Sequence, residues 1–322
     1  MKLALAGDTM LGRSVALALA DRDPASLVAP EVVALVREAD LFVLNLECCI
    51  SERGEPWPTA GKPFFFRAPP QATELLVELG VGCVTLANNH ALDFGRDALL
   101  DTFEHLSAAG IPWAGAGAGV EEARAPTVVG GADLRVGVVA FSDHPADYAA
   151  EPEKPGIAWV DLQREGVPSW LLETLKSLDT DVVLTLAHWG PNMCDRPQRY
   201  IRDAAAELQD AGATLIAGHS AHVVQGVERG VLYDLGDFLD DYRVDPELRN
   251  DLGLLFMLDV DAGGPRRLEA IPLKLEYCFT RLAAGDDAAW IRGRFRELCA
   301  ELGTEVAERD GRLVLEWRPA SS

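Results

Sequence analysis

Two histidines three residues apart follow a short apolar run in the second half of the chain. The run covers residues 215–218 and ends in a glycine, and His219 and His222 come after it. Imidazole is the commonest metal-binding side chain and the one that titrates nearest to neutral pH. The end of a strand is also where open α/β sheets keep their chemistry. The segment predicts a buried strand that delivers two candidate metal ligands, although two solvated loop histidines would give the same local pattern.

The same pattern recurs at four other places in the chain. Apolar runs at 3–6, 41–44, 84–87 and 183–187 each lead into a polar side chain that can do chemistry. These side chains are, in order, Asp8, Glu47, the triplet Asn88-Asn89-His90, and His188. Each run has the length and composition of a buried strand. Because five independent accidents are improbable, we interpret the five strand ends as one convergent polar site.

The remaining sequence predicts the elements that would position these residues. Strands are predicted at 2–6, 41–44, 64–66, 81–87, 111–114, 127–130, 134–141, 181–188, 215–218, 231–235, 252–260, 267–275 and 313–317. Helices are predicted at 14–19, 30–38, 72–79, 96–108, 168–178, 197–211 and 286–302. Residues 51–63 predict a loop, and residues 143–155 predict a surface loop. The first half alternates strands and helices and the second half adds hairpins, which favours sheets inside and helices outside.

Charge and composition exclude several classes of function. The 322 residues carry a formal net charge of −22, from 29 Lys and Arg against 51 Asp and Glu. This charge argues against a nucleic-acid surface, which needs a basic face, and against stable contact with anionic lipid. No stretch has the length of a transmembrane helix, and we expect a cytoplasmic protein without a membrane anchor. The six cysteines form no CxxC pair, so we expect buried, reduced thiols.

Six segments in chain order resemble the motif series of the CapA family. They are GDTMLGR (7–13), NLE (45–47), ANNHALDFG (87–95), HWG (188–190), GHSAHVVQ (218–225) and LGDF (235–238). The family comprises poly-γ-glutamate capsule biosynthesis proteins, which resemble calcineurin-like metallophosphoesterases. The resemblance implies an α/β fold, a four-layer α/β/β/α sandwich of two mixed sheets that is metallo-dependent phosphatase-like. We expect this domain at 1–280, with a helix and strand extension at 281–322 packed on it.

The resemblance also implies roles for individual residues. The implied metal ligands are Asp8, Glu47, Asn89, His188, His219 and His222, with Glu47 as the bridging carboxylate. His90 takes the place of the histidine that protonates the leaving group, and Asp93 could hold its imidazole in one tautomer. We therefore expect one or two divalent transition metal ions, Zn, Mn or Fe, because imidazole and carboxylate suit these better than Ca. A pair of such ions can activate water and neutralise a phosphoryl group.

The expected partner is a small-molecule or peptide substrate with an anionic group. Arg13 and Arg67 are candidate anion clamps, because guanidinium matches phosphate and carboxylate in a bidentate way, and Trp189 is a further substrate-binding candidate. Met10 stands where phosphoesterases usually have a histidine ligand, so one metal site is short of a ligand. Asp237 stands where many CapA-like sequences have asparagine, and is a candidate ligand or base. His105 and His144 lie outside the motifs, and we expect them at the surface.

Three functions remain open from the sequence. The first is a metal-dependent, phosphoesterase-like hydrolase. The second is an acid–base enzyme on the same scaffold that acts on an amino acid or peptide, by Cα epimerisation or by amide or polyglutamate processing. In this enzyme Asp8 or Asp237 would oppose a histidine across the substrate. The third is a non-enzymatic component of polymer biosynthesis, which the charge of −22 disfavours because an anionic polymer would be repelled.

Overall fold

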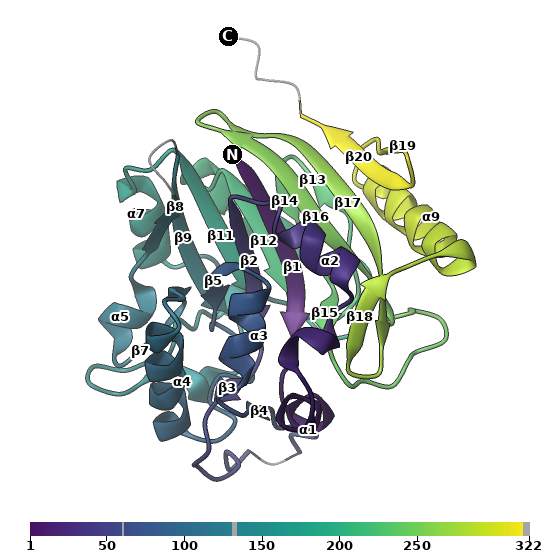
Figure 1. The fold of residues 1–322 in the computed structure, drawn as a ribbon. Coiled ribbons are helices and arrows are strands. Elements are labelled where there is room, and N and C mark those ends of the chain that lie inside the picture. The colour runs from purple at the N-terminus through teal and green to yellow at the C-terminus, as the bar shows by residue number, and fades with distance from the viewer. Residues whose placement is uncertain (60, 131–133, 318–322) are drawn as a thin grey trace.

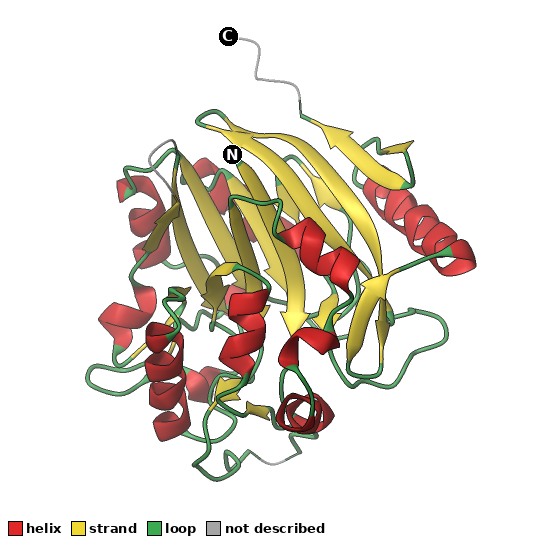
Figure 2. Cartoon of the chain, in the orientation of Figure 1, coloured by secondary structure: helices red, strands yellow, loops and turns green. Residues whose placement is uncertain are grey.

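The computed structural model describes residues 1–59, 61–130 and 134–317. Two mixed β-sheets form the centre of the molecule, and helices lie outside them (Figures 1 and 2). Residue 60 of the expected loop 51–63 and residues 318–322 of the expected C-terminal extension lie outside the described part. Within that part, no helix is long and apolar enough to cross a membrane.

The larger sheet has ten strands. Its main path runs β19-β20-β17-β16-β1-β2-β5-β6, with β15 beside β1 and β18 beside β17. The strands are β1 (Lys2–Thr9), β2 (Leu41–Leu46), β5 (Val81–Thr85), β6 (Trp113–Ala114), β15 (Asp237–Leu239), β16 (Leu252–Asp261), β17 (Gly264–Glu276), β18 (Phe279–Leu282), β19 (Ala307–Arg309) and β20 (Arg312–Glu316). Strands β1, β2, β5 and β6 are parallel, whereas β16 to β20 pair in antiparallel fashion.

The second sheet has six strands in the order β13-β14-β12-β11-β9-β8. They are β8 (Thr127–Gly130), β9 (Arg135–Ser142), β11 (Val182–His188), β12 (Leu215–His219), β13 (Val227–Glu228) and β14 (Val231–Leu232). Two short pairs complete the strands: β3 (Cys49–Ile50) with β4 (Arg67–Ala68), and β7 (Ala116–Gly117) with β10 (Gly156–Ile157). Strands β9, β11 and β12 are parallel, so their carboxyl ends meet at one edge.

The helices form the two outer layers. The described ones are α1 (Arg13–Asp21), α2 (Pro30–Val36), α3 (Ala72–Glu78), α4 (Arg96–Ala108), α5 (Val120–Arg124), α6 (Leu162–Glu165), α7 (Ser169–Ser177), α8 (Arg199–Asp210) and α9 (Gly285–Glu301), with 3-10 turns η1 (Pro24–Leu27) and η2 (Ala146–Tyr148). Helices α1 to α4 pack on the ten-stranded sheet and α7 and α8 on the six-stranded sheet. Helix α9 contacts β16 and β17 of one sheet and β13 of the other.

Side-chain alternation along the strands produces three buried layers. In β1, Leu3 and Leu5 belong to the core between the two sheets, whereas Ala4 and Ala6 belong to the core under the outer helices. Successive side chains of a strand point to opposite faces, so a strand covered on both faces is apolar throughout. The same alternation holds in β11. The expected four-layer α/β/β/α sandwich of two mixed sheets is confirmed.

Some expected elements differ in the structure. Residues 64–66 are not a strand, because the Phe66 amide donates to the Asp93 carboxylate at 2.6 Å and the strand begins only at Arg67. The expected surface loop at 143–155 contains Tyr148, which is fully buried and donates its hydroxyl to Asp93 at 2.9 Å. The expected helix and last strand at the C-terminus do not differ: they are α9 and β20, and β20 pairs with β17 in the ten-stranded sheet.

Gly7 forms a bulge that turns Asp8 toward the six-stranded sheet. Ala6 pairs with Leu44 of β2, but Asp8 pairs with Asn45, so one residue of β1 has no partner. Strict alternation would place Asp8 on the outer face with Ala6; the extra residue reverses its side. A Cβ atom on Gly7 would lie 1.8 Å from the carbonyl oxygen of Gly236, which accepts the Asp8 amide at 2.8 Å. Only glycine fits here.

We expect Gly7→Ala to lower the free energy of unfolding by about 3 kcal/mol or more, because β1 must separate from the Gly236 backbone. Urea denaturation followed by far-UV circular dichroism measures this change. Gly293→Ala in α9 is the matched control, since a Cβ atom there meets nothing within 4 Å. This control is expected to gain about 0.5–1 kcal/mol. Equal effects of the two substitutions would contradict the close approach at Gly7.

Candidate metal centre

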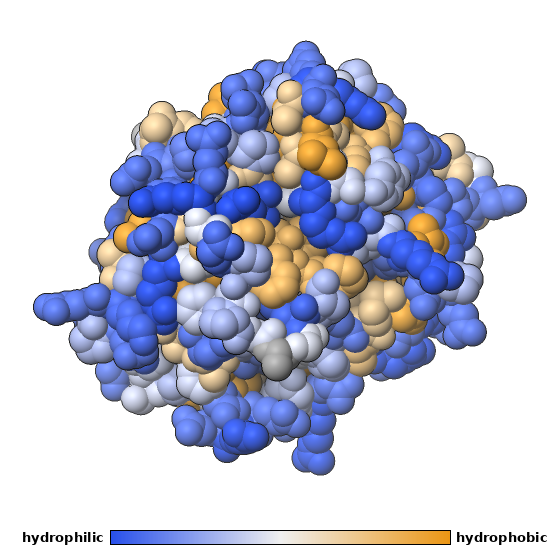
Figure 3. Space-filling model, turned by 90° about the horizontal axis from the view of Figure 1, so that it is seen from below, coloured by the Kyte–Doolittle hydropathy of each residue, from blue (hydrophilic) through white to orange (hydrophobic). Residues whose placement is uncertain are grey.

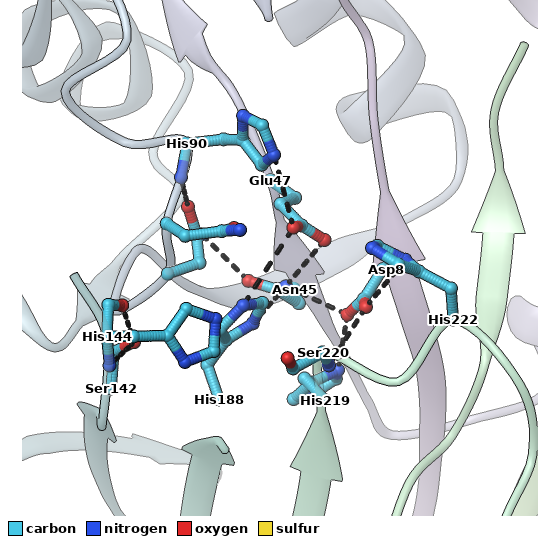
Figure 4. Close-up of polar contacts among 12 residues, drawn as sticks. Asp8, Asn45, Glu47, His90, Ser142, His144, His188, His219, Ser220 and His222 are labelled. Carbon is cyan, nitrogen blue, oxygen red and sulfur yellow. Dashed lines mark hydrogen bonds and ion pairs between the residues drawn. The ribbon is translucent and has the colours of Figure 1, made fainter. Parts of the chain in front are cut away.

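Strand ends from both sheets meet at one buried polar cluster (Figure 4). Asp8 lies near the end of β1 and Glu47 directly follows β2. From the other sheet, His188 ends β11 and His219 ends β12, and these two residues are register partners. His222 follows in a turn in which Ser220 and His222 have φ values of +105° and +60°. Such left-handed conformations are costly for residues other than glycine and are typical of functional sites.

The Asp8 carboxylate joins the two sheets. Its Oδ1 accepts from Asn45 Nδ2 at 2.9 Å and faces His219 Nδ1 at 3.0 Å. Its Oδ2 accepts from the Ser220 amide at 3.1 Å and lies 3.3 Å from His222 Nδ1. Burial raises the pKa of Asp8, but the hydrogen bond with His219 and the nearby imidazoles outweigh burial and hold this pKa well below its usual value. Asp8 is therefore a carboxylate at neutral pH.

Glu47 is a fully buried acid beside a second acid. Its Oε1 lies 3.9 Å from the Nε2 atoms of both His90 and His188, and its Oε2 lies 3.4 Å from Asn45 Nδ2. Burial, and then the negative charge of Asp8, raise the pKa of Glu47 well above its usual value. A buried pair of carboxylates is costly unless a cation or a proton compensates the charge.

Several ligand-type atoms of this cluster have no hydrogen-bond partner among the described residues. They are Glu47 Oε1, Asn89 Oδ1 and the Nε2 atoms of His188, His219 and His222. Buried polar atoms are nearly always partnered, so a group of unpartnered ones indicates a missing ligand. The Nδ1 atoms of His219 and His222 face carboxylates, which leaves the Nε2 atoms for a metal, as in many metal sites.

Ligand atoms of Asp8, Glu47 and His222 lie within 4.8 Å of one another. The charges of Glu47 and Asp8 raise the pKa of His222 although burial opposes this. Acidic side chains thus gather where imidazole nitrogens are available. A cluster of this chemistry can hold a divalent metal ion.

His90 lies at the edge of the cluster and belongs to a second network. Its Nδ1 is 2.6 Å from Asp93 Oδ2, and Asp93 Oδ1 also receives the Tyr148 hydroxyl and, at 2.5 Å, the ammonium of Lys62. Burial lowers the pKa of His90, and Asp93 partly counteracts this. With Nδ1 held by Asp93, the Nε2 atom of His90 points toward Glu47.

Asp237 contacts the cluster through His222. β15 pairs with β1 so that Asp237 is the partner of Asp8, and its Oδ1 lies 2.8 Å from His222 Nδ1. Burial, and then the charge of neighbouring Asp240, raise the pKa of Asp237 well above its usual value. Met10, two residues after Asp8, is fully buried under the outer helices and does not face the cluster.

The three expected substrate-binding residues do not line the cavity beside the cluster. Arg13 lies 3.4 Å from Asp241, and Arg67 lies 4.2 Å above the ring of Phe94 while donating to backbone carbonyls. Trp189 is buried in the core of the six-stranded sheet. The two guanidinium groups thus have partners within the protein, and the Trp189 indole donates to the Tyr233 carbonyl at 3.0 Å.

Sequence reasoning missed two residues beside the cluster. Lys62 donates to the Asn89 carbonyl at 2.5 Å as well as to Asp93, and no motif marked it. His144 was expected at the surface, but its ring centroid lies 5.1 Å from that of His188. It follows the end of β9, whose Ser142 is the register partner of His188, so the strand-end rule would have found it. His105 is half-buried at the end of α4.

The cysteines show no sign of reactivity. All six are free thiols and all but Cys194 are buried. Burial raises the pKa of Cys48 well above its usual value and that of Cys49 to about 12. The thiol pair after Glu47 is thus protonated at neutral pH and a poor nucleophile.

A cavity of about 510 Å³ opens beside His90 and His222. The face seen in Figure 3, at the carboxyl ends of the central parallel strands, has an apolar centre surrounded by hydrophilic residues. The cavity is lined by Lys62, Pro63, Phe64, Asn89, His90, Asn192, Met193, His222, Tyr242, Arg243, Val244, Asp245, Pro246 and Asn250. Asn89 and His222, which carry two of the unpartnered ligand atoms, thus line a space that admits a substrate.

Comparison with known proteins decides the family. Residues 2–242 match the family model described as bacterial capsule synthesis protein PGA_cap. The chain belongs to this family, the CapA family. The membership expected from the six motifs is confirmed.

Similar proteins agree with this assignment. A probable polyglutamine synthesis accessory protein of Mycobacterium tuberculosis is 32% identical over 88% of this CapA-family chain and 78% of its own length. The capsule biosynthesis protein CapA of Bacillus anthracis is 25% identical over 86% and 68%. A hypothetical protein from Thermus thermophilus has a similar fold, with a TM-score of 0.51, 16% identity and coverage of 85% and 99%.

Proposed function

We propose that this CapA-family protein is a metal-dependent hydrolase of phosphoesters or related anionic esters. The observation that carries the proposal is the set of five unpartnered, buried ligand atoms where two sheets meet. With Asp8, which already contacts two histidines, the same side chains form the ligand set that the CapA motifs imply. A substrate reaches them through the adjoining cavity.

The residues that would hold the metal are Asp8, Glu47, Asn89, His188, His219 and His222. A bound divalent metal centre lowers the pKa of water and offsets the charge of a phosphoryl group. Because Met10 faces the opposite core, the position that often carries a further histidine supplies nothing here. The proposal therefore includes one or two ions of Zn, Mn or Fe per chain, with one site poorer in protein ligands.

The other residues of the site bind and move protons. His90 is the proposed general acid: as the imidazolium, with the Nδ1 proton shared with Asp93, it gives the Nε2 proton to the leaving oxygen and becomes neutral. Asp93 holds the other ring nitrogen and thereby fixes the orientation of the imidazole. Lys62 and Tyr148 hold Asp93 from the opposite side. The buried ring of His90 thus has one orientation before substrate binds.

A second candidate is acid–base chemistry on an amino-acid polymer. It is supported by the names of relatives, which refer to polyglutamine synthesis and capsule biosynthesis. It is also supported by buried Asp237 in contact with His222, since an acid with a raised pKa can exchange a proton near neutral pH. Incubation of glutamate-containing peptides in D₂O tests it, and a lack of deuterium at Cα would count against epimerisation.

The proposed hydrolase is tested by elemental analysis of the purified protein together with a panel of phosphomonoesters and phosphodiesters. We expect one or two equivalents of transition metal and ester hydrolysis that a chelator removes and the metal restores. Absence of metal after incubation with Zn, Mn and Fe would refute the metal centre. Bound metal without hydrolysis of any ester would leave the metal centre standing and refute the reaction.

A further inference from the structure

The cavity beside the metal centre has apolar walls that are open to solvent. Phe64, Met193 and Val244 are among the large apolar side chains with high exposure, at 41%, 38% and 46%. All three line the cavity, together with the ring of Tyr242, which lies 5.7 Å from that of Phe64. Contiguous exposed apolar side chains around a hollow mark a site for an apolar ligand rather than a solvated surface.

The cavity is also lined by polar and charged residues. His90, His222 and Asn89 connect it to the metal centre. Two cationic residues line the cavity: Lys62 is ion-paired with Asp93, whereas the Arg243 side chain forms no ion pair with any residue that the structure describes. Asp245, which also lines the cavity, uses a carboxylate oxygen to accept the amides of Glu247 and Leu248 at 2.9 Å. Arg243 therefore offers a cation to an anionic group in the cavity, although the chain carries a net charge of −22.

We propose that this cavity binds the alcohol part of the ester, and that this alcohol is apolar. The inference rests on the proposed function, which places His90 next to the leaving oxygen. Because His90 lines the cavity, the group attached to that oxygen extends between Phe64, Met193 and Val244. The substrate class is thus an anionic ester of an alkyl or aryl alcohol. A volume of about 510 Å³ lies within the range of sites that enclose most of a small organic ligand.

Binding of alkylphosphonates tests the inference without turnover. Methyl-, butyl- and octylphosphonate have the same anionic group and differ only in apolar length. Calorimetric titration of the metal-loaded protein is expected to show that affinity rises about two- to fourfold for each methylene that enters the cavity. Butylphosphonate, with three more methylenes, should therefore bind about ten- to sixtyfold more tightly than methylphosphonate. Equal affinities across the series, or no binding of any member, would overturn the proposal.

Matched variants locate the effect in the cavity. Val244 and Val128 are 46% and 47% exposed, but Val128 lies on the edge strand β8 and does not line the cavity. The ratio of the affinity for butylphosphonate to that for methylphosphonate is expected to fall at least threefold in Val244→Asn. In Val128→Asn this ratio should stay unchanged. An unchanged ratio in the Val244 variant would refute the assigned walls. Chain-length-dependent binding without ester hydrolysis would refute the reaction and leave the apolar subsite in place.

Discussion

Glu47→Gln protein is expected to lose its bound metal and about a thousandfold in ester hydrolysis. The side chain keeps its size but can no longer offer a carboxylate to a metal ion, in a fully buried site where Oε1 lies 3.9 Å from the Nε2 atoms of His90 and His188. A neutral amide is a much weaker ligand for a transition metal than a carboxylate. Since metal centres supply several kcal/mol of transition-state stabilisation, activity falls with occupancy.

Elemental analysis and thermal unfolding measure this loss independently of activity. A cation that binds only the folded protein raises Tm with its concentration. We expect Zn or Mn to raise the Tm of the parent protein and to leave that of Glu47→Gln nearly unchanged. Glu151→Gln is the control, because Glu151 is an exposed partner of Lys154. Full metal content in the Glu47 variant would show that Glu47 is not a required metal ligand.

His90→Asn is expected to lower hydrolysis of alkyl phosphates about a hundred- to a thousandfold while metal content stays unchanged. An alkoxide is a poor leaving group unless it is protonated, so loss of the general acid lowers the rate of hydrolysis of these substrates by its full effect. For p-nitrophenyl phosphate, whose leaving group needs no proton, we expect a loss of less than tenfold. Steady-state kinetics with both substrates give the comparison.

Lys62→Met separates positioning from proton donation. Lys62 holds Asp93 at 2.5 Å, and Asp93 holds the His90 ring. The variant is expected to show the same dependence on leaving group as His90→Asn, with a smaller loss, and Lys62→Arg should restore part of it. Equal losses with both leaving groups in the His90 variant would mean that His90 acts in binding and is not the acid.

Much of the site was predictable because strands end where the chemistry is. Apolar runs that stop at Asp8, Glu47, His188 and His219 are visible in the sequence, and parallel pairing brings such ends to one edge. The family motifs then indicated the two-sheet architecture. Neither the shared strand edge nor the two-sheet architecture depends on knowing the orientation of individual side chains.

The other features of the site depend on three-dimensional contacts that short sequence patterns do not encode. Strict alternation along β1 would place the Asp8 side chain on the outer face of the sheet. The bulge at Gly7, where the backbone lies against that of Gly236, places it on the inner face instead. Lys62 reaches the site from a loop without any motif. Arg13 and Arg67 were expected to bind anions, but their cationic groups lie against Asp241 and against the Phe94 ring. Such partners follow from tertiary packing.

The seam between the two sheets has a consequence for the order in which the molecule opens. Asp8 from one sheet contacts His219 and Ser220 of the other, and the apolar core between the sheets continues beyond them. A cation held by both sheets would resist their separation but would do little for fraying of the outer helices. With metal bound, the two sheets should therefore unfold as one cooperative unit. Without metal, the two sheets can separate from each other before the rest of the protein unfolds.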